Sequence, residues 1–250
     1  MPANRKASAV YVGCAGWNVP PTQKRHFPAE GSHLTRYAAR FGAVEINSSF
    51  YGPHSHATYA RWRGSVPAPF RFSVKVPKSI THERRLVGVK RLLTTFLDQV
   101  AGLGPKLGCL LVQLPGSLEF KPRVARDFFA ALRKKHADPV ILEPRHASWF
   151  KPAAEQLLKE FRIARAAADP AVVPSAATPG GWPGIVYYRL HGSPRMYFSS
   201  YSDADLIALA SQLRAQAQKR IPVWCIFDNT AYGVATGNAL DLLELLPKAR

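Results

Sequence analysis

The stretch IVYYRLH at residues 185–191 is a short apolar run that ends in polar residues. Such a run is typical of a buried strand in a parallel sheet. Strand side chains alternate between two faces, so Arg189 and His191 lie on the same face. The stretch therefore predicts a strand that delivers an arginine and a histidine to one side near its C-terminal end.

Seven further apolar runs have a similar length. Together the eight runs are Val10–Gly13, Ala43–Asn47, Phe70–Val76, Gly108–Leu114, Pro139–Glu143, Arg162–Ala168, Ile185–His191 and Pro222–Asp228. Between most of them lie stretches with apolar residues at helical spacing, for example Leu206, Leu209, Ala210 and Leu213. This alternation predicts a parallel sheet covered by helices, and eight repeats in 250 residues predict one (β/α)8 TIM-type barrel.

The pattern is least regular between residues 170 and 184, which are rich in Pro, Gly and Ala. We therefore expect an irregular sixth crossover without a regular helix. We expect residues 1–9 to be a disordered or extended segment and residues 10–250 to form a single domain, because no internal linker or repeat interrupts the pattern.

Composition excludes several classes of protein. Hydrophobic residues make up 47% of the chain and charged residues 20%, which is typical of a globular protein. No apolar run approaches the ~18 residues that span a bilayer, and the N-terminus has no apolar stretch of a secretory signal. We expect a cytoplasmic protein with no membrane partner.

The net charge of +18 favours attraction to nucleic acid or to smaller polyanions. The densest group of cations begins on the third predicted strand and continues into its following loop. It consists of Lys75, Lys78, Arg84, Arg85, Lys90 and Arg91, with Glu83 opposing. Loop aromatics beside such cations are suited to stacking on bases or sugars.

Polar residues gather at the predicted C-terminal ends of the strands, where barrel active sites form. The candidate catalytic residues are Glu45, His82, Glu143, His191 and Asp228. The candidate substrate-binding residues are Trp17, Asn47, Tyr51, Lys75, Gln113, Arg145, Trp149, Arg189 and Asn229. The carboxylates suggest a general base, the histidines an acid or base, and Lys75, Arg145 and Arg189 an anion-binding group. The alternative is an internal ion-pair network that closes the top of the barrel.

Several motifs along the chain are shared with one known family. They are Gly13–Trp17, Val44–Tyr51, Phe72–Pro77, Ile80–His82, Leu107–Gly108, Gln113–Pro115, Glu143–His146, Ser148–Phe150, Tyr188–Gly192 and Phe227–Thr230. By these motifs the chain resembles the YecE-like family, a domain of unknown function numbered 72. The resemblance covers roughly residues 10 to 246. It implies a barrel fold with a shared pocket, and it implies no particular reaction.

Three functions are compatible with these residues. The leading hypothesis is an enzyme that acts on an anionic, phosphate- or carboxylate-bearing substrate, with hydrolysis of a phosphate-containing substrate as the first choice. The alternatives are a non-catalytic module that binds nucleic acid and an isomerase or lyase of sugars or sugar acids. The expected partner is an anionic small molecule or nucleic acid, and the sequence indicates no protein partner.

No cofactor and no metal site is expected. The alternative is a divalent metal held by some of the residues Glu45, His82, Glu143, His146, His191 and Asp228. The chain lacks an HExxH motif, and the nearby cations would repel a metal ion.

Overall fold

The structure is a computed structural model that describes residues 10–246. Its strands are β1 Val10–Cys14, β2 Ala43–Ile46, β3 Arg71–Lys75, β4 Leu107–Gln113, β5 Val140–Glu143, β6 Ile163–Arg165, β7 Ala167–Asp169, β8 Gly180–Gly181, β9 Val186–Leu190 and β10 Val223–Phe227. Its α-helices are α1 His33–Ala38, α2 His56–Gly64, α3 Lys90–Val100, α4 Pro122–Arg133, α5 Pro152–Glu160, α6 Asp203–Ala217 and α7 Val234–Leu245. The predicted segment 1–9 lies outside the described residues, as does the end of the predicted domain.

The strands form two ladders. One has the order β1-β10-β9-β7 and the other the order β2-β3-β4-β5-β6-β8. Every pairing is parallel except that of β8 with β6, which is antiparallel. The chain is therefore an α/β fold with parallel strands, as the sequence predicts.

The two ladders are joined at two places. Strands β6 and β7 are separated by the single residue Ala166, whose N–H donates to the carbonyl of Leu142 at the end of β5. On the other side, Ala15 bridges Glu45 in a parallel sense, and the N–H of Gly16 donates to the carbonyl of Glu45 over 2.9 Å. The predicted strand Arg162–Ala168 thus pairs with β5 through its first half and with β9 through its second.

The connection from β7 to β9 contains a 3-10 helix, Pro174–Ala177, and the two-residue strand β8. No α-helix lies between residues 170 and 185. This agrees with the irregular crossover predicted from the Pro- and Gly-rich sequence.

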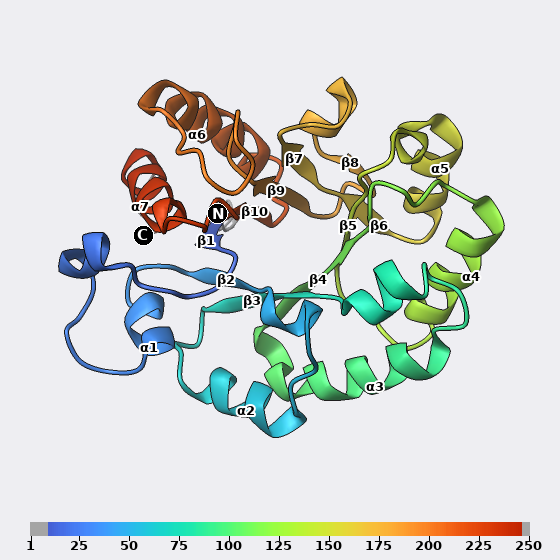
Figure 1. The fold of residues 1–250 in the computed structure, drawn as a ribbon, viewed down its shortest axis with the longest axis horizontal. Helices are drawn as coiled ribbons and strands as arrows, with labels where there is room; N and C mark the ends of the chain where they lie inside the picture. Colours follow the sequence, from blue (N-terminus) through green and yellow to red (C-terminus); the bar gives the residue numbers. More distant parts are fainter. Residues whose placement is uncertain (1–9, 247–250) are drawn as a thin grey trace, which may run out of the picture.

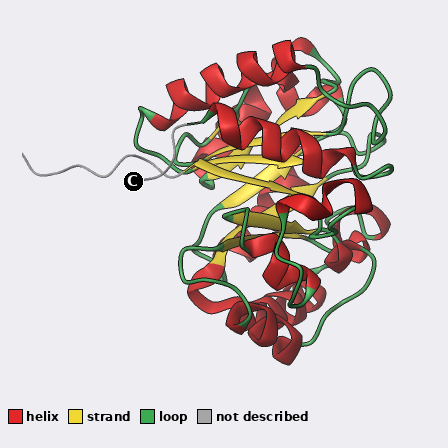
Figure 2. Cartoon of the chain, turned by 90° about the vertical axis from the view of Figure 1, so that its left-hand side faces the viewer, coloured by secondary structure: helices red, strands yellow, loops and turns green. Residues whose placement is uncertain are grey.

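The helices lie outside the strands. Figure 1 shows α6 and α7 beside β9, β10 and β1, and α3 to α5 along the other ladder. The strands run through the middle of the molecule with helices on both sides (Figure 2). The larger apolar core fills the space between strands and helices, with residues such as Val44, Ile46 and Leu240.

A second apolar cluster gathers strand residues from both ladders and includes Ala43, Cys109, Ile141, Tyr187 and Trp224. These side chains belong to the strand face opposite to the one that packs on the helices. The cluster therefore forms an interior layer in which side chains from the two ladders meet.

Gly108 in β4 leaves room for the indole ring of Trp224. A Cβ atom at residue 108 would lie 2.4 Å from Cζ2 of Trp224, closer than non-bonded atoms approach. The Trp224 ring is buried and stacks on Tyr187 with ring centroids 5.9 Å apart, so it cannot move aside freely.

We predict that Gly108→Ala lowers the free energy of unfolding by about 1–3 kcal/mol, the usual penalty for overpacking a core. Urea denaturation would measure the effect. Gly42→Ala is the matched control, because a Cβ atom at residue 42 meets nothing within 4 Å. Equal midpoints for the two variants would contradict the proposed steric role of Gly108.

Candidate functional site

Charged side chains from both ladders meet at the C-terminal ends of the strands. We call this set the buried charge network, and its members are Glu45, Lys75, Glu143, Arg189, His191 and Asp228. Each is the last residue of its strand, lies one residue inside it or follows it directly. Because the strands are parallel, their C-terminal ends share one side of the fold, and this brings residues far apart in sequence together.

Arg189 holds the network together. Its side chain has no exposed surface. Nη2 donates to Oε1 of Glu45 over 2.7 Å, and Nε lies 3.0 Å from Oε2 of the same carboxylate. Nη1 donates to Oε2 of Glu143 over 3.1 Å, and Nη2 also lies 2.9 Å from Oδ2 of Asp228. One guanidinium thus serves three carboxylates from three different strand ends.

These contacts determine the protonation of Arg189 and Glu143. Burial disfavours the charge of Arg189, but the three carboxylates outweigh burial and raise its pKa. Burial also acts to raise the pKa of Glu143, yet Arg189, Arg145 and His191 hold that pKa well below its usual value. Arg189 therefore stays protonated and Glu143 stays ionised.

The sequence predicts that Arg189 binds the anion of a substrate. The structure does not favour this role, because Nε, Nη1 and Nη2 are all used by carboxylates and the side chain is sealed from solvent. We assign Arg189 instead to holding the carboxylates in place.

Tyr187 and Ser73 also support Glu45. The hydroxyl of Tyr187 lies 2.8 Å from Oε2 of Glu45 and 3.0 Å from Oγ of Ser73. Tyr187 was not among the predicted site residues. A signal was present in the sequence, because Tyr187 is in phase with Arg189 and His191 on the same strand face.

His191 links two of the carboxylates. Its Nδ1 lies 2.9 Å from Oδ2 of Asp228, and its Nε2 lies 3.0 Å from Oε1 of Glu143. Nη2 of Arg145 lies 2.7 Å from the same Nε2. A protonated Nε2 would donate to Glu143, and an unprotonated Nε2 would accept from Arg145. The surroundings of His191 therefore provide a partner for either protonation state, which is what a proton-transfer group needs.

Arg145 lies at the edge of the network. Its Nε donates to Oε1 of Glu143 over 2.7 Å, and Nη1 reaches Sδ of Met196 at 3.9 Å. The side chain keeps 12% of its surface exposed, whereas that of Glu143 keeps 1%. Within the described part of the chain Nη1 therefore has only a weak sulfur acceptor, and Arg145 remains able to bind an incoming anion.

Lys75 differs from the other cations. It is 6% exposed, and its Nζ lies 4.2 Å from the centroid of the Phe50 ring. Among residues 10–246, Nζ has no hydrogen bond or ion pair with a protein group. Burial lowers the pKa of Lys75 to about 8, with Arg189 adding to the effect and the carboxylates Glu45, Glu143 and Asp228 opposing it.

The charges of the network and its edge cancel. Glu45, Glu143 and Asp228 contribute three negative charges, and Lys75, Arg145 and Arg189 contribute three positive charges. Apart from His191, these charges sum to zero. This balance explains how so many ionisable groups are buried together, since an isolated buried charge is very costly.

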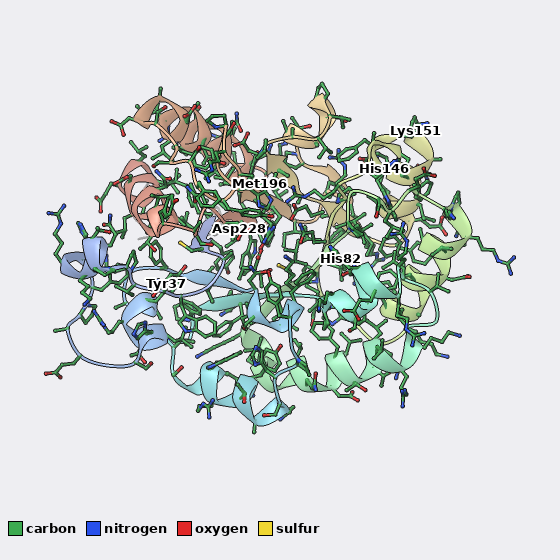
Figure 3. The ribbon with its side chains drawn as sticks, in the orientation of Figure 1. Tyr37, His82, His146, Lys151, Met196 and Asp228 are labelled. Carbon is green, nitrogen blue, oxygen red and sulfur yellow. The ribbon has the colours of Figure 1, made fainter. Side chains whose placement is uncertain are left out.

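A loop after β9 covers the network. The Tyr197 ring packs edge-on against His191, with centroids 5.7 Å apart, and it stays partly exposed. The loop is held by the Tyr201 hydroxyl, which donates to Oδ2 of Asp169 over 2.6 Å and accepts from the N–H of Gly192. Figure 3 shows Met196, from this loop, in the same central region as Asp228.

The three candidate amide residues have different surroundings. Asn229 is buried and its Nδ2 donates to the carbonyl of Ser199 and to Oδ1 of Asn238, so it fastens the covering loop. Oδ1 of Asn47 is buried without a hydrogen-bond partner in the described part of the chain. Gln113 ends β4, in register with Glu143 on β5, and is partly exposed.

The candidate aromatic residues lie outside the network. Trp149 is buried and its Nε1 donates to the carbonyl of Leu118, which indicates a packing role. Trp17 packs edge-on against Trp62 at 5.0 Å, and Tyr51 is 71% exposed. Of these three, Tyr51 alone presents most of its surface to solvent.

His82 and Lys75 both contact the Phe50 ring. Its ring packs edge-on against Phe50, the same ring that lies under the lysine, with centroids 4.9 Å apart. Its Nδ1 lies 2.8 Å from Oγ1 of Thr81. Burial, with the charge of Lys75 adding to it, lowers the pKa of His82.

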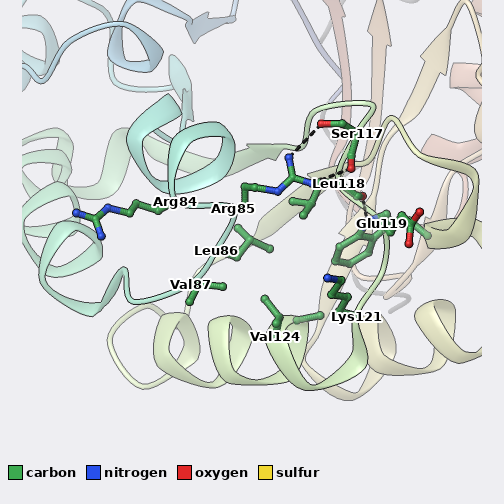
Figure 4. A pocket seen from close by; sticks show the side chains of 11 residues that line it. Arg84, Arg85, Leu86, Val87, Ser117, Leu118, Glu119, Lys121 and Val124 are labelled. Atoms are coloured by element: carbon green, nitrogen blue, oxygen red, sulfur yellow. Dashed lines mark hydrogen bonds between the residues drawn. The ribbon is translucent and has the colours of Figure 1, made fainter.

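The basic segment that follows β3 borders a surface cavity of about 470 Å³. Arg84, Arg85 and Lys121 line this cavity together with Glu119. Figure 4 shows the Arg85 guanidinium turned toward Ser117, where it donates to the carbonyl over 2.7 Å and to Oγ over 3.0 Å. Elsewhere in the segment, Lys78 pairs with Glu83 at 3.3 Å.

The candidate metal ligands do not form one cluster. In the described part of the chain, no group of three or more His, Cys, Asp or Glu side chains has an arrangement that could hold a metal ion. His146 lies toward α5, well apart from Asp228 (Figure 3), and its Nδ1 lies 2.8 Å from Oγ of Ser148.

Within residues 10–246, no helix is both long and apolar enough to cross a membrane.

A family model described as "Protein of unknown function DUF72" matches residues 11–250. The chain belongs to the DUF72 family. The resemblance inferred from the motifs is thereby confirmed.

The curated proteins that match the chain include two UPF0759 proteins. The UPF0759 protein YunF of Bacillus subtilis is 23% identical over 95% of this chain and 94% of its own length. The UPF0759 protein YecE of Escherichia coli is 32% identical over 114 residues, which are 46% of this chain. That match spans 40% of the length of YecE.

Solved DUF72 structures share the fold. A DUF72 family protein from Enterococcus faecalis superimposes with a TM-score of 0.79 at 24% identity, over 95% of both chains. One from Thermotoga maritima superimposes with a TM-score of 0.77 at 24% identity, over 94% of this chain and 98% of its own.

Because Arg189 neutralises three buried carboxylates, we predict that Arg189→Ala lowers the free energy of unfolding by about 3–5 kcal/mol, as expected when one partner of a buried ion pair is removed. Chemical denaturation would measure this change. Arg123→Ala, on the exposed face of α4, is the matched control. A loss below about 1 kcal/mol for Arg189→Ala would show that the carboxylates do not depend on it.

We predict that one lysine amine titrates near pH 8, because burial lowers the pKa of Lys75 to about 8. Nitrogen-detected NMR of the lysine side chains would follow the titration. The signal should be absent from Lys75→Met and present in Lys134→Met, which removes an exposed lysine. Titration of every lysine near its usual pKa of about 10.4 would contradict the assignment.

Proposed function

We propose that this protein is an enzyme that acts on an anionic, phosphate- or carboxylate-bearing substrate at the C-terminal ends of its strands. The observation that carries the proposal is the Lys75 ammonium, which lies almost buried beside three carboxylates and has no ion pair within residues 10–246. A network built only for stability would be expected to pair each of its charges.

The proposal includes a closed (β/α)8 barrel. The support is that β6 and β7 act as one strand shared between the ladders, while the Ala15–Glu45 bridge joins the other side. Counted in this way, eight strands surround the interior apolar cluster and the network above it. Closure would bring the covering loop and Phe50 to a single opening.

Each group of the site would have a separate task. Lys75 and Arg145 would bind the substrate's anion, because both are cations with donor capacity left over. His191 would transfer a proton, since Nε2 has both a carboxylate and a guanidinium within reach. Asp228 would orient the histidine through Nδ1.

Hydrolysis of a phosphate-containing substrate fits these tasks. The two cations would bind phosphate oxygens, and His191 would protonate the leaving oxygen. The three carboxylates of the network argue against a simple nucleic-acid binder, because carboxylates repel phosphate groups. An isomerase or lyase of sugar acids would use the same anion-binding cations.

We predict that inorganic phosphate and oxalate raise the melting temperature of the wild-type protein and leave that of Lys75→Met unchanged. The reason is that Lys75 supplies a cation free to bind an anion. Thermal denaturation at increasing anion concentration would measure the shift, which should saturate as a single site fills.

Lys134→Met is the control for net charge and should respond like the wild type. An equal shift in all three proteins would mean that the anions bind elsewhere, and it would overturn the proposed site. A wild type that does not respond to either anion would do the same.

A further inference from the structure

Lys75 combines features that seldom occur together in a lysine. Lys75 is 6% exposed, its Nζ lies over the Phe50 ring at 4.2 Å, and no residue among 10–246 forms an ion pair or a hydrogen bond with Nζ. Lysine ammonium groups are strongly hydrated and normally reach water or a carboxylate. An amine kept dry and unpaired can lose its proton more readily and then offers a nucleophilic lone pair.

The groups around Lys75 act on its amine in opposite directions. Glu45, Glu143 and Asp228 favour the charged form, whereas burial and the charge of Arg189 disfavour it. The His82 ring packs edge-on against Phe50, the ring that Lys75 also contacts. The carboxylates are already engaged by Arg189, so none of them fixes the amine in an ion pair.

We propose that Lys75 forms an imine with the carbonyl carbon of a small substrate that also carries an anionic group, such as a 2-oxo acid or a phosphorylated ketone. This inference rests on the proposed function for the location of the site. It makes Lys75 a covalent catalytic residue in addition to an anion-attracting one, and it directs the search toward carbonyl compounds.

The bond changes balance without a further reactant. The lone pair of the neutral Lys75 amine attacks the carbonyl carbon, so that a C–N bond forms and the C=O π bond breaks, and one proton of the nitrogen passes to the oxygen. The hydroxyl group of this adduct then takes a second proton and leaves as water, while nitrogen gives up its remaining proton and the C=N bond forms. Amine and carbonyl thus yield imine and one water molecule.

Arg145 provides a position for the anionic group of the substrate. It borders Glu143, one of the carboxylates that also acts on Lys75, and it is more exposed than Arg189. Within the described residues, its Nη1 has one hydrogen-bond acceptor, the Met196 sulfur at 3.9 Å. A carboxylate or phosphate would be a stronger acceptor than this sulfur.

Reductive trapping tests the inference. The wild-type protein is incubated with pyruvate or with dihydroxyacetone phosphate in the presence of cyanoborohydride, which adds hydride to the imine carbon and leaves a stable secondary amine. Peptide mass mapping should place the adduct on Lys75, at a rate on the order of tenfold above any other lysine. The expected pyruvate adduct adds the mass of pyruvic acid less one oxygen atom.

Lys75→Arg is the decisive variant, because it keeps the positive charge but cannot form an imine. It should lose the adduct while retaining the stabilisation by oxalate or phosphate. Lys134→Met should keep the adduct on Lys75 at the wild-type rate. Chemical denaturation of each variant would verify that it folds.

Two results would overturn the inference. One is the absence of an adduct on Lys75 with both carbonyl compounds, and the other is labelling spread equally over the lysines. If oxalate or phosphate still stabilised the wild type but not Lys75→Met in either case, the anion-binding site of the proposed function would stand and only the imine would be excluded. If the wild type formed no adduct on Lys75 and was also not stabilised by oxalate or phosphate, both the imine and the proposed anion-binding site would be overturned.

Discussion

The sharing of one buried guanidinium by three carboxylates is the interaction on which this site depends. Arg189 comes from β9, Glu45 from β2, and Glu143 from β5, so the contacts cross from one ladder to the other. Like-charged carboxylates brought this close would repel one another without the cation. The guanidinium can serve all three because it is planar and presents several donors in fixed directions.

This arrangement leaves a specific imbalance. Arg189 forms ion pairs with Glu45, Glu143 and Asp228, and Arg145 forms a second ion pair with Glu143. Lys75 completes the charge balance without an ion pair in residues 10–246, and its Nζ lies over the face of the Phe50 ring. The network and Arg145 together therefore hold three carboxylates and three cations, while one of these cations, Lys75, has no ion pair within the described residues.

Sequence periodicity predicted many of these positions because each follows from a local rule. Glu45, Glu143 and Arg189 lie on the inner faces of strands whose alternation is visible in the sequence. Other features could not be found in this way. Trp149 reads as a loop aromatic, yet its indole is buried against the carbonyl of Leu118, a residue from a different loop. Helix α2 buries one residue, Tyr59, against the rest of the fold. Its sequence therefore has no apolar stripe at helical spacing from which the helix could be predicted.

The sequence by itself determined the alternation of strands and helices, the family and the set of polar residues at the strand ends. These follow from the periodicity of apolar side chains and from short motifs, and both are set by residues close together in the sequence. The tertiary structure decided which of those residues pair. Arg189 forms ion pairs with three carboxylates, and the Tyr187 hydroxyl donates to Glu45. Lys75 has no ion pair in the described residues. The reason is physical, because these hydrogen bonds and ion pairs depend on distances between residues far apart in the chain, more than a hundred positions for the contacts of Glu45 with Arg189 and Tyr187. No local pattern specifies those distances.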